Sequence, residues 1–274
     1  MAEQGPLCVA LEITRTYRQS KIRQTISLYR YGKRIDFDTW IDWSEHHTLL
    51  KVAFPVNVLS PMATFDVQWG NVQRATHRNT SWDWARFETC AHKWADLSEG
   101  NYGVALLNDC KYGYDVHDNI MRLSLLKSAT DPDPMADQGE HRMTYSLLPH
   151  SGDWRAEVPA AAYDLNDPLI VRRVQSATGN QTGPTFPSLV SVSPPNVIIE
   201  TIKRAEDGNG LIVRLFENQR NRGSFTLTAG FELAGAVHCN LLEENAESIQ
   251  VENNAITLDI TPYQIMSLRL IPKK

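Results

Sequence analysis

An alternation of apolar and polar side chains with a period of two dominates the first third of the sequence. Val9, Leu11 and Ile13 fall on one side of such a pattern while Glu12 falls on the other, and the pattern returns twice before residue 42. These runs are rich in Val, Ile, Thr and aromatic residues. A period of two places successive side chains on opposite faces of a β-strand, so this part of the chain predicts a meander of long strands.

Strand patterns continue through the rest of the chain, and helical periodicity is sparse. We expect a loop leading into a strand at residues 79–88, a rigid polar loop with two prolines at 131–140, and strands at 141–150 and 168–174. Residues 175–195 are rich in Ser, Thr, Gly and Pro, which indicates a linker and places a domain boundary near residue 190. Six short strand patterns follow, at residues 196–206, 210–218, 223–230, 236–244, 255–260 and 263–271. The sequence therefore predicts an all-β fold that ends in a small sandwich.

Length, charge and cysteine content limit the classes of protein to which the chain can belong. Its 274 residues suffice for two domains, and its net charge of -5 without any basic block argues against a nucleic-acid partner. The opening residues lack a signal-peptide pattern, and no run approaches the ~20 apolar residues of a membrane span. Four widely spaced cysteines without a CxxC pair indicate reduced thiols. We expect a soluble, cytoplasmic protein with no membrane partner.

Motifs that would identify a catalytic or metal site are missing from the sequence. It contains neither GxSxG nor HExxH, and the adjacent His46 and His47 would point to opposite faces of a strand. A metal site from His77, Cys90 and His92 is weighed against a buried thiol and hydrogen-bonded histidines, which are the commoner outcome. Carboxylates are plentiful between residues 83 and 118, so choosing a catalytic pair from spacing alone has little force.

The run of residues 92–116, HKWADLSEGNYGVALLNDCKYGYDV, has the composition of an active-site rim. Together with the segment before it, it holds aromatic residues beside Asp, Asn and His, which is the usual lining of a sugar site. These aromatics are Trp82, Trp84, Trp94, Tyr102, Tyr112 and Tyr114. Core packing between two sheets is the favoured interpretation for the tryptophans. A pocket rim is slightly favoured for Lys111, Tyr112 and Tyr114, which surround a glycine after an acidic turn.

Two long runs resemble glycoside hydrolase family 38 α-mannosidases, and within that family the cytosolic and vacuolar branch. They are HRNTSWDWARFETCAHKWADLSEGNYGVALLNDCKYGYDV at residues 77–116 and SLLKSATDPDPMADQGEHRMTYSLLPHSG at residues 124–152. The likeness extends over about residues 44–149, and residues 263–271 resemble the family's last strand. The motifs are long and specific.

The resemblance implies an architecture and a division of labour. Family members carry an α/β catalytic domain, a helical bundle and a C-terminal β region with a large sandwich like the galactose-mutarotase supersandwich. By this likeness, residues 1–176 are a truncated supersandwich domain, 177–194 a linker and 195–274 a small terminal β-sandwich. The retaining hydrolysis of terminal α-D-mannose from oligosaccharides needs carboxylates and a divalent metal such as zinc, held in the catalytic domain. No stretch of this chain matches those motifs, so we expect no catalytic residue, metal or cofactor here.

The resemblance also implies a supporting role, in which the β region closes one side of the active-site cleft of the catalytic domain. Five residues are then candidates for the substrate rim: Asn108, Asp109, Lys111, Tyr112 and Tyr114. Golgi and lysosomal branches carry a longer, Arg-containing loop after the equivalent of Asn108 and Asp109, so their Arg contact does not transfer. Asp96, Asp109 and Asp115 are then interpreted as turn-forming and supporting groups.

Two other functions stay open at this point. One is an independent sugar-binding module that stacks mannosides on Trp82, Trp84 and the tyrosines, and the other is mutarotase-like catalysis, for which no His and Glu pair is assignable. A sandwich that lacks its first strands also exposes an unpaired edge, and such edges recruit other chains. We therefore expect the isolated chain to form a homodimer, with the basic edge at residues 14–21 as its candidate contact.

Overall fold

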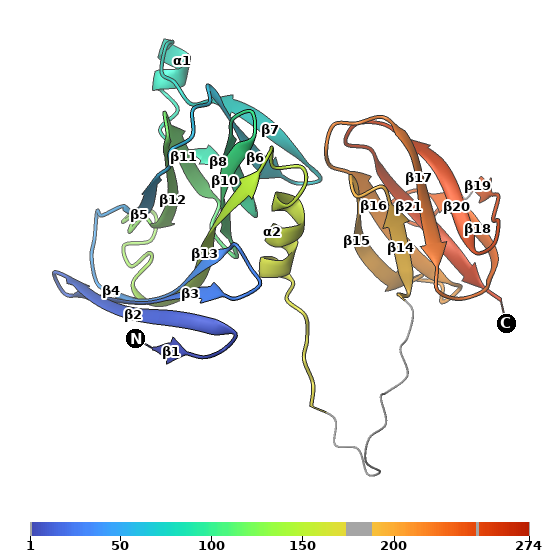
Figure 1. The fold of residues 1–274 in the computed structure, drawn as a ribbon, viewed down its shortest axis with the longest axis horizontal. Coiled ribbons are helices and arrows are strands. Elements are labelled where there is room, and N and C mark those ends of the chain that lie inside the picture. Colours follow the sequence, from blue (N-terminus) through green and yellow to red (C-terminus); the bar gives the residue numbers. More distant parts are fainter. Residues whose placement is uncertain (1, 174–187, 245–246, 274) are drawn as a thin grey trace. The chain divides into compact units, whose positions relative to one another are not determined.

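The computed structural model describes residues 2–173, 188–244 and 247–273 and divides the chain into two compact units, residues 1–170 and 171–274. Each unit is a β-sandwich built from antiparallel strands, as the first view of the chain shows (Figure 1). The predicted all-β fold class, a large sandwich followed by a small one, is confirmed. No helix in the described residues is long and apolar enough to cross a lipid bilayer.

The first unit packs a nine-stranded sheet against a four-stranded one. The larger sheet has the order β1 (Glu3–Gln4), β2 (Cys8–Tyr17), β3 (Ser20–Tyr29), β4 (Ile35–Trp43), β13 (Gly139–Ser151), β10 (Tyr102–Asn108), β9 (Trp94–Ser98), β6 (Met62–Val67) and β7 (Gly70–Ala75). The smaller sheet has the order β5 (Leu50–Pro55), β12 (Ile120–Leu126), β11 (Gly113–His117) and β8 (Thr89–Cys90). The alternation seen in the sequence matches β2, β3 and β4, which pair in continuous register.

The core of the first unit lies between these two sheets and holds Trp43, Phe65, Leu97, Leu106, Tyr114, Met121 and Leu123. The central strand β10 is buried on both faces, because Val104 and Leu106 point into this core while Ala105 and Leu107 pack on the other side. A strand with two covered faces reads as a continuous apolar run instead of an alternation. The burial of β10 on both faces therefore explains why residues Val104 to Leu107 are all apolar.

A helix that the sequence analysis did not predict covers the outer face of β10. Helix α2 (Val158–Asn166) packs its Val158 and Ala162 against Leu107, Trp94 and Trp154. Its second residue is Pro159, whose fixed φ suits the first helical turn, and alanines follow. Nine residues are too few to show a periodicity in the sequence, so the helix owes its stability to the sheet face that it covers.

The strand predicted at residues 168–174 is wrong for its described part. Residues 168–173 have no regular structure, and Leu169 is 93% exposed; Val174 lies outside the described residues. The strand was predicted from β-branched residues, which favour strands only where they can pack against neighbours on a paired sheet. None of the described strands pairs with this segment, so the preference is not realised.

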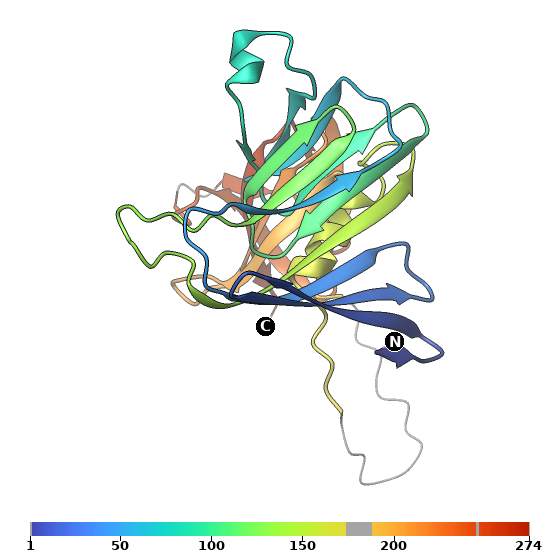
Figure 2. The same cartoon turned by 90° about the vertical axis from the view of Figure 1, so that its left-hand side faces the viewer.

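The two loops predicted at residues 79–88 and 131–140 are present, but the first contains a short helix and the second ends one residue before β13. Residues 79–88 contain the short helix α1 (Ser81–Trp84) before β8, and this turn projects away from both sheets (Figures 1 and 2). Its N-cap Thr80 accepts a hydrogen bond from the backbone N–H of Asp83, 3.1 Å away. The polar loop predicted from residue 131 runs without helix or strand to residue 138, where β13 follows.

The second unit packs a three-stranded sheet on a five-stranded one. The first has the order β14 (Val190–Ser193), β17 (Gly223–Ala229) and β20 (Ala255–Ile260), and the second has the order β15 (Val197–Arg204), β16 (Leu211–Glu217), β21 (Ile265–Pro272), β18 (Leu233–Cys239) and β19 (Glu247–Ile249). The six predicted strands correspond to β15, β16, β17, β18, β20 and β21, although β18 ends at Cys239 and not at residue 244; β14 and β19 were not predicted. Of the predicted linker at 177–194, residues 177–187 lie outside the described residues, and residues 190–193 form β14, which pairs with β17. The small sandwich therefore begins before residue 195.

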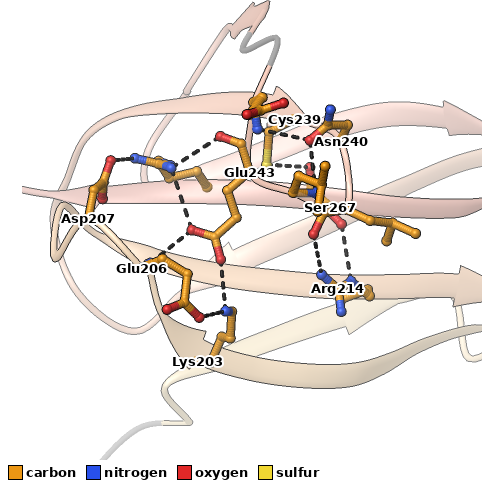
Figure 3. Close-up of polar contacts among 12 residues, drawn as sticks. Lys203, Glu206, Asp207, Arg214, Cys239, Asn240, Glu243 and Ser267 are labelled. Carbon is orange, nitrogen blue, oxygen red and sulfur yellow. Dashed lines mark hydrogen bonds and ion pairs between the residues drawn. The ribbon is translucent and has the colours of Figure 1, made fainter.

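A polar network joins the loops at one end of this small sandwich (Figure 3). The Glu243 carboxylate forms a salt bridge with Lys203 at 2.8 Å and a second one with Arg269 at 3.6 Å. Arg269 also pairs with Asp207, and Lys203 pairs with Glu206. The network links β15, β21 and the loop after β18, which are three separate parts of the five-stranded sheet.

Candidate functional site

The predicted rim lies on the loop that joins β10 to β11, and Asn108 holds that loop in place. Its side-chain amide donates a 2.9 Å hydrogen bond to the carbonyl oxygen of His92, while its Oδ1 accepts from the backbone N–H groups of Cys110, at 2.9 Å, and Lys111. An Asn side chain that binds backbone groups two and three residues ahead fixes a tight turn. Asn108 is buried, so its role is to shape the loop.

Tyr114 supports the same loop from inside the core. Its ring is fully buried and meets Phe65 edge-on, with centroids 6.4 Å apart. Its hydroxyl accepts from the Asn108 amide and donates to the carbonyl oxygen of His92 at 3.3 Å. Burial raises the pKa of Tyr114 far above its ordinary value, so the phenol stays neutral. Tyr114 is thus a core residue of the rim loop.

The other three predicted rim residues lie at or near the surface. Asp109 is exposed, but its Oδ2 accepts from the backbone N–H of Thr144 at 2.9 Å, which ties the loop to β13. Tyr112 is 58% exposed, and its ring packs edge-on against His92 with centroids 5.4 Å apart. Lys111 is half-buried. Two of the five predicted residues are therefore buried, Asp109 and Tyr112 are exposed, and Lys111 is partly exposed. That the loop lines a substrate rim stays a prediction.

Asp66 is a part of this site that the sequence analysis did not single out. Its Oδ2 accepts from the backbone N–H of Lys93 at 2.9 Å, and its carbonyl oxygen accepts from the N–H of His92 at 2.9 Å. Burial raises the pKa of Asp66 to about 6, against the opposing effect of Lys93. Asp66 lies near the end of β6, and its partners His92 and Lys93 are far from it in the sequence. The pairing of β6 with β9 brings these residues together.

His92 and Lys93 complete the surroundings of the loop. Burial and the charge of Lys93 lower the pKa of His92, which keeps its imidazole neutral at neutral pH. The Lys93 ammonium lies 4.7 Å from the ring centroid of Tyr163 in α2, a cation–π distance. The surroundings of the loop therefore hold the ring of Tyr112 on the loop itself, the Lys93 amine just before β9 and the Asp66 carboxyl, with a pKa of about 6, on β6.

The remaining predicted carboxylates have structural partners elsewhere. Asp96 is buried against His150, and Asp115 forms salt bridges with Arg122 at 3.2 Å and Lys51 at 3.7 Å. Their interpretation as supporting groups agrees with these contacts. Within the described ranges, no three His, Cys, Asp or Glu side chains converge in an arrangement suited to a metal ion. His77, Cys90 and His92, weighed as a metal site, are not such a group.

The tryptophans divide between core and surface. Trp94 is buried and packs on Trp154, with ring centroids 5.1 Å apart. Trp82 and Trp84, by contrast, are 80% and 61% exposed on the projecting α1 turn. The core interpretation favoured for the tryptophans thus holds for Trp94 and is wrong for the other two, because the four-residue helix lies outside both sheets, where the Arg78 guanidinium stacks over Trp84 at 5.4 Å.

Comparison with known proteins assigns the chain to a family. The sequence pattern of the glycosyl hydrolases family 38 C-terminal domain matches residues 1–135, and that of the family 38 C-terminal beta sandwich domain matches residues 196–268. The chain belongs to the C-terminal region of glycoside hydrolase family 38. The resemblance stated from residues 77–116 and 124–152 is confirmed.

Relatives of this family 38 region are named as α-mannosidases. The chain is 41% identical to Alpha-mannosidase 2C1 of Mus musculus and 42% identical to that of Homo sapiens, each over 258 residues that cover 92% of this chain and 24% of the relative. It is 37% identical to Alpha-mannosidase G of Dictyostelium discoideum over 280 residues, which cover 98% of this chain and 26% of that protein. The family 38 region therefore spans about a quarter of the length of these relatives.

A solved structure shares the fold of the family 38 region. The crystal structure of an alpha-mannosidase from Enterococcus faecalis V583 superposes with a TM-score of 0.76 at 18% identity, covering 97% of this chain and 34% of that one. At this identity the likeness concerns the fold alone. The rim loop lies within the first family pattern, and the Lys203, Glu243 and Arg269 network lies largely within the second.

Proposed function

We propose that this chain is the C-terminal β region of a retaining, metal-dependent α-mannosidase that removes terminal α-D-mannose from oligosaccharides. In this role it supports and closes the active site of an N-terminal catalytic domain of the same polypeptide and is inactive alone. The observation that carries the proposal is the identity of 37–42% to proteins named α-mannosidases over more than nine-tenths of the chain. Among the residues that the structure describes, no group of three His, Cys, Asp or Glu side chains suits a metal ion, and no catalytic step is assigned to this chain.

The contribution of the chain is to hold an outward-facing loop in one conformation. Asn108 and Tyr114, both buried, fix the loop through hydrogen bonds to backbone atoms of His92 and Cys110, which lowers the cost of ordering Tyr112 and Lys111 for contact. An aromatic ring beside an amine suits a sugar, whose C–H face stacks on the ring while its hydroxyls accept hydrogen bonds. The free thiols of all four cysteines support the cytoplasmic location expected from the sequence.

The catalytic part of the proposal is tested with an aryl α-mannoside. The isolated chain is expected to release no mannose, with or without added zinc or cobalt, because it lacks the catalytic carboxylates. In the complete enzyme, Tyr112→Ala is expected to lower kcat/KM, whereas Tyr31→Ala, an exposed tyrosine on the turn after β3, is expected to leave it unchanged. Turnover by the purified chain alone would overturn the proposal, and equal kcat/KM for the two variants would remove the rim role.

A second candidate is a sugar-binding module, favoured by the exposed Trp82 and Trp84 on a capped helical turn. Calorimetry of the isolated chain with mannose and short mannosides separates the two. Binding tighter than about millimolar (about -4 kcal/mol) that is lost in Trp82→Ala and Tyr112→Ala favours the module. The proposed supporting role predicts no measurable binding without the catalytic domain.

A further inference from the structure

An arginine faces the interior at the edge of the nine-stranded sheet. Arg74 lies on the edge strand β7 and pairs with Ala63 of β6, which is buried, so both side chains point to the covered side of the sheet. The Arg74 guanidinium lies over the ring of Phe65, 4.7 Å from its centroid. Its Nη1 is buried and has no hydrogen-bond partner in the part of the chain that the structure describes. A buried donor without a partner is costly, so this atom calls for a ligand or a water.

Arg74 lines a small cavity between the two sheets of the first unit. The cavity is bounded by β7, β8, β11 and the loop that carries α1, which lie together at one end of the unit (Figure 1). Its volume is about 30 Å³. A water molecule needs about 10–15 Å³ by the same measure. The cavity therefore admits one compact group and is too small for a sugar ring.

Two of the carboxylates on the wall of this cavity are neutralised by cations outside it. Besides two histidines, the ionisable residues of the wall are Arg74, Arg78, Arg86, Asp83, Glu88 and Asp115. Glu88 forms a salt bridge with Lys51 at 2.8 Å. Asp115 forms a salt bridge with Arg122 at 3.2 Å. Neither Lys51 nor Arg122 lines the cavity, so the positive charge of the wall is not used up by these two carboxylates.

The three arginines of the wall share the one remaining carboxylate. Asp83 lies 3.9 Å from Arg86. Arg78 stacks over Trp84 and, like Arg74, forms no salt bridge with any described residue. Burial lowers the pKa of Arg74, and the charge of Arg86 also lowers it. The wall thus carries more positive than negative charge around a partly desolvated guanidinium, which favours an anion with two charges over one with a single charge.

We propose that this cavity binds a small oxyanion of the phosphate class, with the Arg74 guanidinium as its inner contact. A planar guanidinium donates two parallel hydrogen bonds to such an oxyanion, and phosphate carries close to two negative charges near neutral pH. Arg86, whose side chain is 55% exposed, lies at the mouth of the cavity. The volume admits the phosphate group alone, so the remaining part of a phosphomonoester would lie outside. The site uses none of the five predicted rim residues.

Protection of an open edge is the other role that an inward-facing charge can have. β7 is the last strand of its sheet, and a charge on its inner face discourages pairing with another chain. A single arginine serves that purpose, and a long side chain usually carries its charged end to water. Arg74 instead buries Nη1, and two further arginines line the same cavity. A bound oxyanion accounts for both of these features.

Calorimetric titration with inorganic phosphate tests the site, both in this chain and in the complete enzyme that carries it. Sulfate, glycerol phosphate and glycerol are titrated at the same ionic strength, because salt screens charges. The variants are Arg74→Gln and Arg74→Lys, of which the second keeps the charge and loses the planar fork. Arg142→Gln is the matched control, because Arg142 is an exposed strand residue that does not line the cavity.

We expect phosphate and sulfate to bind and glycerol not to bind. Arg74→Gln is expected to weaken phosphate binding about tenfold or more, which corresponds to one charge-assisted hydrogen bond. Arg74→Lys is expected to weaken it less, and Arg142→Gln is expected to leave it unchanged. Both possible sources of the group support the site: equal affinity for phosphate and glycerol phosphate assigns it to the phosphate group alone, and tighter binding of glycerol phosphate assigns it to a phosphomonoester.

Three results of the titrations would overturn the proposal. They are the absence of phosphate and sulfate binding, equal affinities of Arg74→Gln and Arg142→Gln, and binding by this chain that is absent from the complete enzyme. The last result would mean that another part of the polypeptide fills the cavity.

Cys90 provides a readout that needs no variant of Arg74, so it decides the matter even where those variants fail to fold. Cys90 is exposed, and the charge of its thiolate acts on Arg74, whose pKa it raises. An oxyanion on Arg74 would repel that thiolate, which is the reactive form of the thiol. Phosphate is therefore expected to slow the alkylation of Cys90 by the uncharged reagent iodoacetamide, relative to chloride at equal ionic strength. Cys110 is the control, and no slowing at Cys90, or equal slowing at both cysteines, would overturn the assignment to Arg74.

Discussion

Asp96 and His150 form a buried pair in the first unit, with Nε2 of the histidine 2.7 Å from Oδ1 of the aspartate. The other carboxylate oxygen of Asp96 accepts from the hydroxyl of Ser98 at 2.5 Å. The two partners sit on β9 and β13, on either side of β10. A charged pair removed from water in this way is costly to break, because the remaining partner would be left buried and uncompensated.

The first prediction concerns the pH dependence of this pair. Burial by itself lowers the pKa of His150, but the hydrogen bond and charge of Asp96 outweigh it and raise the pKa above its ordinary value. The pKa of Asp96 is raised as well, by burial. Both groups therefore bind their proton more tightly when folded, and stability falls as pH rises. The histidine contribution is complete below about pH 6.5 and is lost as pH climbs through its folded pKa.

Urea unfolding at a series of pH values measures this effect. All seven tryptophans lie in the first unit, so their fluorescence reports its unfolding alone. The urea concentration at the midpoint of unfolding of the wild-type chain is expected to decrease as the pH is raised above about 6.5. In His150→Gln this slope is expected to flatten, and an unchanged slope would mean that other groups cause it.

The second prediction concerns Gly103, which lies on β10 between the two partners. A Cβ at this position would lie 2.4 Å from Oγ of Ser98 and 2.5 Å from Cε1 of His150. Gly103→Ala is therefore expected to lower the free energy of unfolding by about 1–3 kcal/mol, the usual cost of overpacking. Gly100→Ala is the control, because a Cβ there meets no atom within 4 Å. Equal unfolding free energies for the two variants would contradict the arrangement around His150.

The third prediction separates the two tyrosines of the rim loop. Tyr114→Phe removes a hydroxyl that is bonded to Asn108 and His92 in the core, so it is expected to lower the free energy of unfolding by about 1–3 kcal/mol. Tyr112→Phe changes an exposed ring and is expected to stay within about 0.5 kcal/mol of the wild type. Tryptophan fluorescence in urea measures both. A larger loss of unfolding free energy in Tyr112→Phe than in Tyr114→Phe would contradict the assignment of Tyr114 as the residue that supports the loop.

The fourth prediction concerns the two exposed thiols, Cys90 and Cys110. Partial burial of the sulfur, with the hydrogen bond and charge of Asp109, raises the pKa of Cys110 to about 12. The thiolate is the reactive form, so Cys110 is expected to react slowly with Ellman's reagent at pH 8. The fast phase should disappear in Cys90→Ser and persist in Cys110→Ser. Loss of the fast phase in Cys110→Ser would reverse the assignment.

The fifth prediction concerns the charge network of the small sandwich (Figure 3). Glu243→Gln removes the carboxylate shared by Lys203 and Arg269 and is expected to lower the Tm of the second unit at low salt. Added salt should reduce this difference only in part, because the side chains of Glu243 and Arg269 are 5% and 12% exposed and salt screens buried ion pairs less than exposed ones. Glu244→Gln makes the same charge change one residue further on, at an exposed side chain, and serves as the control. Calorimetry follows the transition, and equal Tm values for both variants would mean that the network does not stabilise the sandwich.

Local patterns in the sequence were sufficient for the strands and for the family. Alternation along β2, β3 and β4 has a direct local cause, since successive side chains of a strand point to opposite faces. Six of the eight described strands of the small sandwich and the loop from residue 131 follow from the same kind of local signal. Family membership rested on long motifs at residues 77–116 and 124–152, which are read without any structure.

The tertiary structure decided what each polar or aromatic residue of those motifs does. Trp94 is buried while Trp82 is exposed, Tyr114 is buried while Tyr112 is exposed, and the members of each pair are alike in sequence. Helix α2 and the paired position of Asp66 were also missed. Burial and partners depend on contacts between strands far apart in the chain, such as β6 with β9, and a single sequence carries no signal for those distances.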